Sequence, residues 1–326
     1  MKLALFALVF TAALQAAVEG VVMNGTTGKP QAGATMTLFK IDQNGPNALD
    51  TIKAGPDGSF KFAQEVQGPH LLQAVHEGMV FNKMLPPGRP TTGITVDVYN
   101  ATTNAADAKV TTHMILLEPT GSELAVNESI IFQNDSKTAY YDTSKGTLRV
   151  ALPNAAGGKA RVMVTGPASM PIERVLEKTK TAGVYTVDFP VKPGETRFDL
   201  TYAMPLTTPG KFDGKVLHDG PVRVVAPQGV TLTGDVKQLG TEPQTQAGIY
   251  ELTGRTFSIG IEGTGSLRAG RPGGEGGGEQ AEEDGGAGLQ QIRPRIYVRF
   301  KEILALSLAA LIVGFILLYR KGASKA

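Results

Sequence analysis

The sequence predicts an all-β protein made of tandem β-sandwiches, with one transmembrane helix near its C-terminal end. Three observations predict this fold class. Short runs in which apolar and polar residues alternate recur along most of the chain, as expected of strands with one buried face. Gly and Pro, with 40 and 20 residues, separate those runs. A different kind of apolar run, free of charge, occupies residues 303–319.

Composition limits the possible functions. The chain has 326 residues, which at about 150 residues per domain allows two domains, and 41% of them are hydrophobic, enough for packed cores. A net charge of +2 argues against a nucleic-acid partner. The absence of Cys excludes disulfides, thiolate zinc sites, iron–sulfur clusters and cysteine nucleophiles.

Residues 1–17 are expected to be a secretory signal peptide. Met1-Lys2 gives a positive start, an apolar stretch follows up to Leu14, and Gln15-Ala16-Ala17 supplies small residues for cleavage. Leu14 and Gln15 fit the cleavage site imperfectly, so an uncleaved anchor is the alternative. The stretch is short of the ~20 residues of a transmembrane helix.

Residues 303–319 are expected to span the cytoplasmic membrane once. At 1.5 Å per residue the run covers roughly 26 Å, enough for a thin bilayer core, and Tyr319 suits the interface. The signal peptide sets the orientation, with the ectodomain in the periplasm or extracellular space and residues 320–326 as a cytoplasmic tail. The basic end argues against a lipid-anchor signal, and a processed sorting tail is the alternative.

Between these ends, turn residues and prolines predict the domain boundaries. We expect a first β-sandwich over residues 18–118, a second over 119–227, and a β extension or small third unit over 228–264. Residues 265–291 are a Gly-rich acidic linker, because their composition cannot form a core. Met170 to Lys180 is the one stretch outside the ends that fits either a short helix or a loop.

Alternating apolar residues identify the expected strands. The clearest runs are Ala34-Met36-Leu38, Ile94-Val96-Val98, Ile130-Phe132, Leu148-Val150-Leu152, Tyr185-Val187-Phe189-Val191 and Phe198-Leu200-Tyr202-Met204. Turn signals separate them at Asn24-Gly25, Thr27-Gly28, Asp57-Gly58, Lys145-Gly146, Pro193-Gly194 and Asp219-Gly220.

The segment from Val18 to about Val80 carries a family resemblance. Its parts are Val18-Glu19-Gly20-Val21-Val22, the turn and strand from Thr27 to Leu38, the stretch from Gly55 to Phe62, and the strand from Leu71 to Gly78. Together they resemble the carboxypeptidase regulatory-like domain, a prealbumin-like, immunoglobulin-like β-sandwich. The resemblance implies a binding or structural module and a core formed by Ala34, Met36, Leu38, Phe60 and Phe62.

A looser resemblance covers about Gly121 to Pro205. Val126-Asn127-Glu128-Ser129 and Pro193-Gly194-Glu195-Thr196 resemble the second part of bacterial exported proteins that begin with this module. The four Asn-x-Ser/Thr sequons, at Asn24, Asn100, Asn127 and Asn134, are then interpreted as turn residues rather than glycosylation sites.

No catalytic, cofactor or metal site is expected. The four His residues, His70, His76, His113 and His218, lack zinc spacing, although His76 with Asp57 and Glu77 is a conceivable small site. Serine-nucleophile motifs are absent. A loop with Asp42, Asn44, Asn47 and Asp50 offers oxygen ligands for Ca²⁺ but does not match an EF-hand, so a solvated hairpin loop is favoured.

These observations favour a non-enzymatic, membrane-anchored envelope protein that presents β-sandwiches to an envelope protein partner through sheet edges. The alternative is a cell-surface module that binds polysaccharide on exposed aromatic side chains. Tyr140 and Tyr141 are adjacent, so one should face outward, and Phe81 and Tyr99 are further aromatic candidates. The ligand-binding residues, the partner and the oligomeric state are not given by the sequence.

Overall fold

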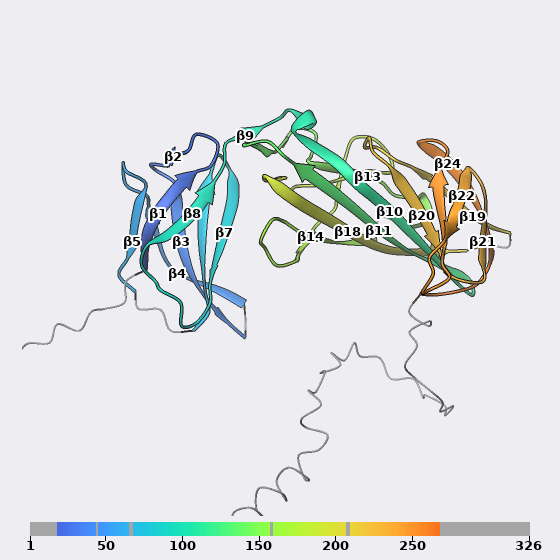
Figure 1. Ribbon diagram of the computed structural model, residues 1–326, viewed down its shortest axis with the longest axis horizontal. Helices are drawn as coiled ribbons and strands as arrows, with labels where there is room; N and C mark the ends of the chain where they lie inside the picture. Colours follow the sequence, from blue (N-terminus) through green and yellow to red (C-terminus); the bar gives the residue numbers. More distant parts are fainter. Residues whose placement is uncertain (1–17, 44, 65–67, 157–158, 207–208, 268–326) are drawn as a thin grey trace, which may run out of the picture. The chain divides into compact units, whose positions relative to one another are not determined.

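The computed structural model describes residues 18–43, 45–64, 68–156, 159–206 and 209–267, and these residues form an all-β protein (Figure 1). Strands dominate, and the helical elements in these ranges are two short 3-10 turns, η1 (Ala105–Asp107) and η2 (Asn154–Ala156). The expected signal peptide and the apolar run at 303–319 lie outside the described residues. Within the described ranges, no helix is long and apolar enough to cross a membrane.

The N-terminal part of the fold has two four-stranded sheets around one core. In the first, β1 (Val18–Asn24) pairs with three strands, β2 (Lys29–Pro30), β5 (Ser59–Phe62) and β8 (Ile94–Val98). The second has the order β4-β3-β6-β7, with β3 (Thr35–Asp42), β4 (Gly45–Lys53), β6 (His70–His76) and β7 (Met79–Leu85). Both sheets bury side chains in one apolar cluster, which confirms the inward positions of Met36, Leu38, Phe60 and Phe62.

Glycine allows the close parallel pairing of β1 and β8. Gly20 pairs with Ile94, and a Cβ atom at Gly20 would lie 1.9 Å from the Ile94 carbonyl oxygen. Gly58 has φ +74°, as the Asp57-Gly58 turn signal predicts, and its carbonyl oxygen accepts a hydrogen bond from Val22 N on β1. The Gly20 contact lets β8 lie beside β1, and the Gly58 contact connects the turn before β5 to β1.

A large eight-stranded sheet forms the centre of the remaining structure. Its order is β15-β14-β18-β11-β10-β20-β23-β22. The strands are β10 (Ala108–Thr120), β11 (Glu123–Asn134), β14 (Ala160–Thr165), β15 (Ile172–Arg174), β18 (Gly194–Pro205), β20 (Val222–Ala226), β22 (Val236–Thr241) and β23 (Gly248–Leu252). The β10–β20 pair is parallel and the other neighbours are antiparallel.

Two three-stranded sheets share apolar clusters with the large sheet. One has the order β13-β17-β16, with β13 (Leu148–Ala151), β16 (Glu177–Lys178) and β17 (Val184–Val187). The other has the order β19-β24-β21, with β19 (Gly210–Lys215), β21 (Val230–Gly234) and β24 (Thr256–Gly263). Every second side chain of β11 and of β18 belongs to one cluster in one half of the strand and to the other cluster in the other half. Since alternate side chains of a strand point to the same side, both clusters lie on one face of the large sheet, here called the inner face.

The connection between the N-terminal sheets and the large sheet supplies one strand of a short parallel pair, and the other strand follows β11. Strand β9 (Ala101–Thr102) pairs with β12 (Ala139–Tyr140). Asn104 caps η1 by accepting the Ala106 amide hydrogen.

The structure differs from the expectations in two segments. The expected boundary at 118/119 falls inside β10, which belongs entirely to the large sheet. Met170–Lys180 contains β15 and β16 instead of the expected short helix or loop, because pairing with β14 and β17 satisfies the backbone of these strands. Residues 230–263 supply strands to the large sheet and to a covering sheet and share their apolar cluster, so they correspond to the β extension, one of the two alternatives expected for 228–264.

Candidate functional site

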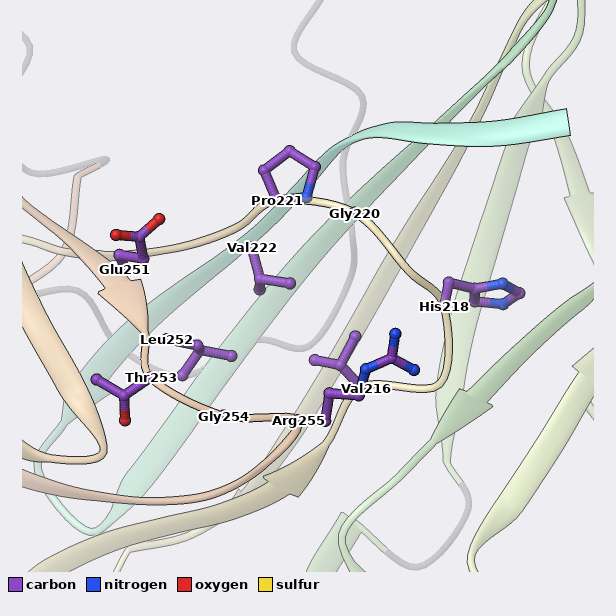
Figure 2. Close-up of a pocket in the computed structure, with 10 residues that line it drawn as sticks. All are labelled: Val216, His218, Gly220, Pro221, Val222, Glu251, Leu252, Thr253, Gly254 and Arg255. Atoms are coloured by element: carbon purple, nitrogen blue, oxygen red, sulfur yellow. The ribbon is translucent and has the colours of Figure 1, made fainter. Parts of the chain in front are cut away.

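Two cavities share one connecting segment, residues 216–221 between β19 and β20. The smaller, about 240 Å³, is lined by Val216, His218, Gly220, Pro221, Val222, Glu251, Leu252, Thr253, Gly254 and Arg255 (Figure 2). The larger, about 630 Å³, is lined by Ala105, Ala106, Ala108, Lys109, Val110, Phe132, Tyr140, Leu217, His218, Asp219 and Gly220. Only the larger volume falls in the usual range of small-molecule sites, about 300–1,000 Å³.

His218 belongs to the walls of both cavities. In Figure 2 its imidazole points away from Val222 and Leu252. The ring packs edge-on against Phe132, with ring centroids 5.2 Å apart, and its Nε2 accepts the Arg149 amide hydrogen at 3.1 Å. Burial lowers the pKa of His218 to about 4. The imidazole is therefore neutral at physiological pH, with its remaining proton on Nδ1.

A second buried histidine lies on the inner face of the large sheet. His113 Nε2 is 2.5 Å from Glu128 Oε1, and both side chains are largely buried. His113 Nδ1 is buried and has no hydrogen-bond partner in the described part of the chain. Burial, followed by the charge of Glu128, raises the pKa of the Tyr202 hydroxyl. The His113–Glu128 pair lies between the two apolar clusters of the inner face.

Charged side chains border the smaller cavity. Arg223 Nη1 donates to Glu251 Oε1 at 2.6 Å, and Arg255 pairs with Asp219. All four side chains remain substantially exposed, so the pairs contribute little to stability. Among the described residues no three His, Asp or Glu side chains gather as metal ligands.

The expected metal-capable residues lie apart. His70 is buried and its Nδ1 contacts Gly68 O at 3.1 Å. Asp57 accepts hydrogen bonds from the Ser59 amide and hydroxyl, which lowers the pKa of this carboxyl, whereas His76 contacts Asn100 Oδ1 at 3.1 Å. In the conceivable His76, Asp57 and Glu77 site, His76 Nε2 and Glu77 Oε1 are therefore 3.9 Å apart, whereas Asp57 belongs to a different hydrogen-bond network.

The acidic loop considered for Ca²⁺ also bonds to neighbouring groups. Asn47 Nδ2 donates to Asp42 Oδ2 at 2.7 Å, while Asp50 accepts its hydrogen bonds from the Thr51 amide and the Gln64 amide group. Asn44 lies outside the described residues. These contacts describe a hydrogen-bonded hairpin.

The aromatic candidates do not present a row of rings to solvent. Phe81 and Tyr140 are buried, at 3% and 8% exposed. Tyr99 and Tyr141 are half-buried against the N-terminal core, and the Tyr141 hydroxyl donates to Asp188 Oδ2 at 3.3 Å. Of these four aromatic residues, Tyr140 lines the larger of the two cavities described above.

Of the four sequon asparagines, Asn24 and Asn134 have the expected role in turns, whereas Asn127 lies within strand β11. Asn24 Oδ1 accepts the Thr26 and Thr27 amide hydrogens, and Asn134 Oδ1 accepts that of Ser136. Both residues are almost fully buried. The Asn134 amide nitrogen also donates to the Thr138 and Val191 carbonyls.

Lys192 is a contact residue that sequence reasoning missed. Its Nζ donates to Val80 O at 2.8 Å and lies 4.6 Å from the centre of the Phe81 ring, both on β7. Burial, followed by the nearby charge of Arg174, lowers the pKa of Lys192 to about 8. The flanking Pro190 and Pro193 are the sequence signal for a fixed loop at this point.

Strand β22 is one of the two edge strands of the large sheet, and β15 is the other. All of its residues but Val236 are exposed, and among the described residues it pairs with β23 alone. The register shifts between Gln238 and Gly240, so Leu239 is the extra residue of a bulge, and 48% of its surface is accessible.

Comparison with known proteins adds no relationship: no family model matches the chain, and no curated protein matches it.

Proposed function

We propose that the chain is a non-enzymatic, membrane-anchored protein of the cell envelope that presents its β domains to a protein partner. The expected signal peptide, acidic linker and membrane helix supply the layout of an anchored ectodomain. The observation that carries the proposal is the exposed edge strand β22, with Leu239 turned outward at its bulge. Edge strands offer free backbone groups to a partner, and the exposed leucine adds an apolar contact.

Other described features support a binding role over a catalytic one. The lone pair on His218 Nε2 already accepts the Arg149 amide hydrogen. This atom therefore does not serve as a base toward a substrate. Glu128, the carboxylate beside His113, lies between apolar clusters on the inner face of the sheet. The proposal therefore assigns these groups to the packing of the fold.

Site-specific photocrosslinking tests this proposal. A photoreactive amino acid replaces Leu239 in the full-length protein, in intact cells, and a matched control replaces Leu49, which is 40% exposed on strand β4. We expect one envelope protein to be captured from position 239 and not from position 49. Equal capture at both positions, or none at 239, would refute the assignment of β22.

Polysaccharide binding is the second candidate, and Tyr140 is the observation that favours it. This ring and Phe132 form part of the wall of the larger cavity, and sugar rings pack on aromatic faces. Tyr140→Ala should abolish retention of the full-length protein on cell-wall glycan, whereas Tyr141→Ala, outside that cavity, should not. Unchanged retention in the Tyr140 variant would exclude this site.

A further inference from the structure

The end of the described chain crosses from one face of the large sheet to the other. Strand β24 belongs to a covering sheet on the inner face. Gly265 N then donates to Pro119 O at 3.0 Å, and Ser266 and Leu267 bond to the side chain of Glu118. Since Leu117 points into the inner cluster, the neighbouring Glu118 points to the opposite, outer face.

Glu118 is a buried carboxylate held by neutral donors. It is 5% exposed. Its Oε1 accepts from Ser266 Oγ and from Leu267 N, both at 2.8 Å, and its Oε2 accepts from Asn127 Nδ2 at 3.2 Å. In the described part of the chain no Lys or Arg forms an ion pair with it. Two of its three donors therefore come from the exit segment, residues 264–267.

The network continues from Glu118 into the middle of the large sheet. Asn127 on β11 also accepts, through Oδ1, a hydrogen bond of 3.2 Å from Thr201 Oγ1 on β18. The exit segment is thus connected to β10 directly and to β11 and β18 through side chains. These strands are central in the sheet order.

The passage around the sheet fits glycine closely. A Cβ atom at Gly265 would lie 2.8 Å from Gln228 O and 3.0 Å from Pro227 Cβ. The backbone therefore approaches the β20–β21 connection more tightly than a larger residue would allow. This fit fixes the path by which the exit segment reaches Glu118.

We propose that Glu118 is a clasp: a positioning residue that fixes where the chain leaves the folded unit and transfers a pull on the following residues to the centre of the large sheet. The physiological source of such a pull rests on the proposed membrane anchor. With the clasp closed, tension reaches β10 and β11 through the Glu118 hydrogen bonds. With the clasp open, the same tension acts on β24, whose only described strand partners are β19 and β21.

Hydrogen–deuterium exchange of the full-length protein in detergent tests the clasp. In Glu118→Ala we expect the Leu267 amide to exchange about tenfold faster or more, and the Gly265 amide to follow, because the segment loses two hydrogen bonds. Amides of β10 and β11 should keep their protection. Glu262→Ala, which removes an exposed carboxylate from β24, is the matched control and should change none of these rates.

A second variant keeps the test decisive if Glu118→Ala does not fold. Ser266→Ala removes one donor and leaves the carboxylate in place, and it should speed exchange at Leu267 several-fold. Unchanged exchange at Leu267 in the folded variants would overturn the proposal, as would a loss of protection spread evenly over β10 and β11. Because exchange is measured within the folded unit, a failed crosslink at Leu239 would leave this result intact.

Optical-tweezers unfolding of the full-length protein, with one handle at the C-terminal end, measures the load path directly. Glu118→Ala should begin to unfold at a lower force than the unmodified protein, whereas Glu262→Ala should not. Equal unfolding forces for Glu118→Ala and the unmodified protein would show that the clasp carries no load.

Discussion

His113 and Glu128 form a contact of 2.5 Å between the side chains of neighbouring strands, on the face of the large sheet that also holds two apolar clusters. The clusters contain different residues of the same strands, and this polar pair lies between them. Removing one partner would leave the other buried without its hydrogen bond, which is costly in an apolar surrounding.

The first prediction concerns this pair. Glu128→Ala should lower the free energy of unfolding by about 3 kcal/mol or more, measured as a lower urea midpoint with an unchanged m-value. Glu128→Gln should cost less, because its side-chain oxygen still accepts a hydrogen bond. Glu123→Ala, at an exposed position of the same strand, is the control, and an equal effect of both alanine variants would contradict the role of the pair.

The second prediction is an acid-dependent loss of stability caused by His218. Its pKa is about 4 in the folded protein and about 6.5 in an unfolded chain. As the pH falls below about 6.5 the unfolded state takes up the proton first, so stability decreases until the pH approaches 4. The maximal loss is about 3 kcal/mol.

Urea titrations between pH 7 and pH 4 measure this loss as a difference between the unmodified protein and His218→Gln. The glutamine oxygen can accept the Arg149 amide hydrogen but does not titrate. As the pH falls, the free energy of unfolding of the unmodified protein should therefore decrease relative to that of His218→Gln. Parallel pH profiles would show that His218 is not held neutral by burial.

The third prediction concerns Lys192 at alkaline pH. Below about pH 8 the amine is charged in both the folded and unfolded states, and burial penalises the folded one. Between pH 8 and about 10.5 the folded protein loses the proton first, so its stability should rise relative to Lys192→Met. The Phe81 ring and the Val80 carbonyl favour the charged amine, so we expect a gain below about 3 kcal/mol.

Urea unfolding at pH 7, 8, 9 and 10 follows this gain. Lys83→Met, at an exposed position of β7, is the matched control and should show no change relative to the unmodified protein across this range. If Lys192→Met follows the same profile as that control, burial does not alter the titration of Lys192.

The fourth prediction is steric. Gly20→Ala should destabilise the N-terminal sheets by about 3 kcal/mol or more, because the added Cβ would overlap the Ile94 carbonyl oxygen and force β1 from β8. Gly240→Ala is the control, since a Cβ there meets no atom within 4 Å. Thermal unfolding should show a large decrease in melting temperature for the first variant alone.

Much of the strand pattern could be predicted from alternation. In β3, β8 and β18 the apolar residues at every second position are the buried ones. Alternation failed where a bulge intervenes: the register shifts between Val110 and Thr112, which brings His113 to the inner face. Alternation also does not show which strands pair. The expected boundary fell inside β10 because β20, the parallel partner of β10, lies far along the chain.

The candidate site was only partly accessible to sequence reasoning. Glu128 occupies the same alternation as Val126 and Ile130, so its burial could have been inferred from period two. The burial of His218 depends on contacts with Phe132 and Arg149, which come from other strands or their ends. Lys192 and Glu118 likewise acquire their surroundings from segments distant in sequence, and no local pattern encodes them.

The parallel pairing of Met114 on β10 with Arg223 on β20 sets an order for biosynthesis. The paired strands of the N-terminal sheets end at Val98, so these sheets can assemble while later residues are still being made. The large sheet must wait until β20, β22 and β23 have emerged. During that interval β10 and β11 can form their hairpin, but one long edge stays without its neighbour, and such edges attract misassembly. A chaperone that shields β10 would therefore act on the nascent chain, before β20 is synthesised.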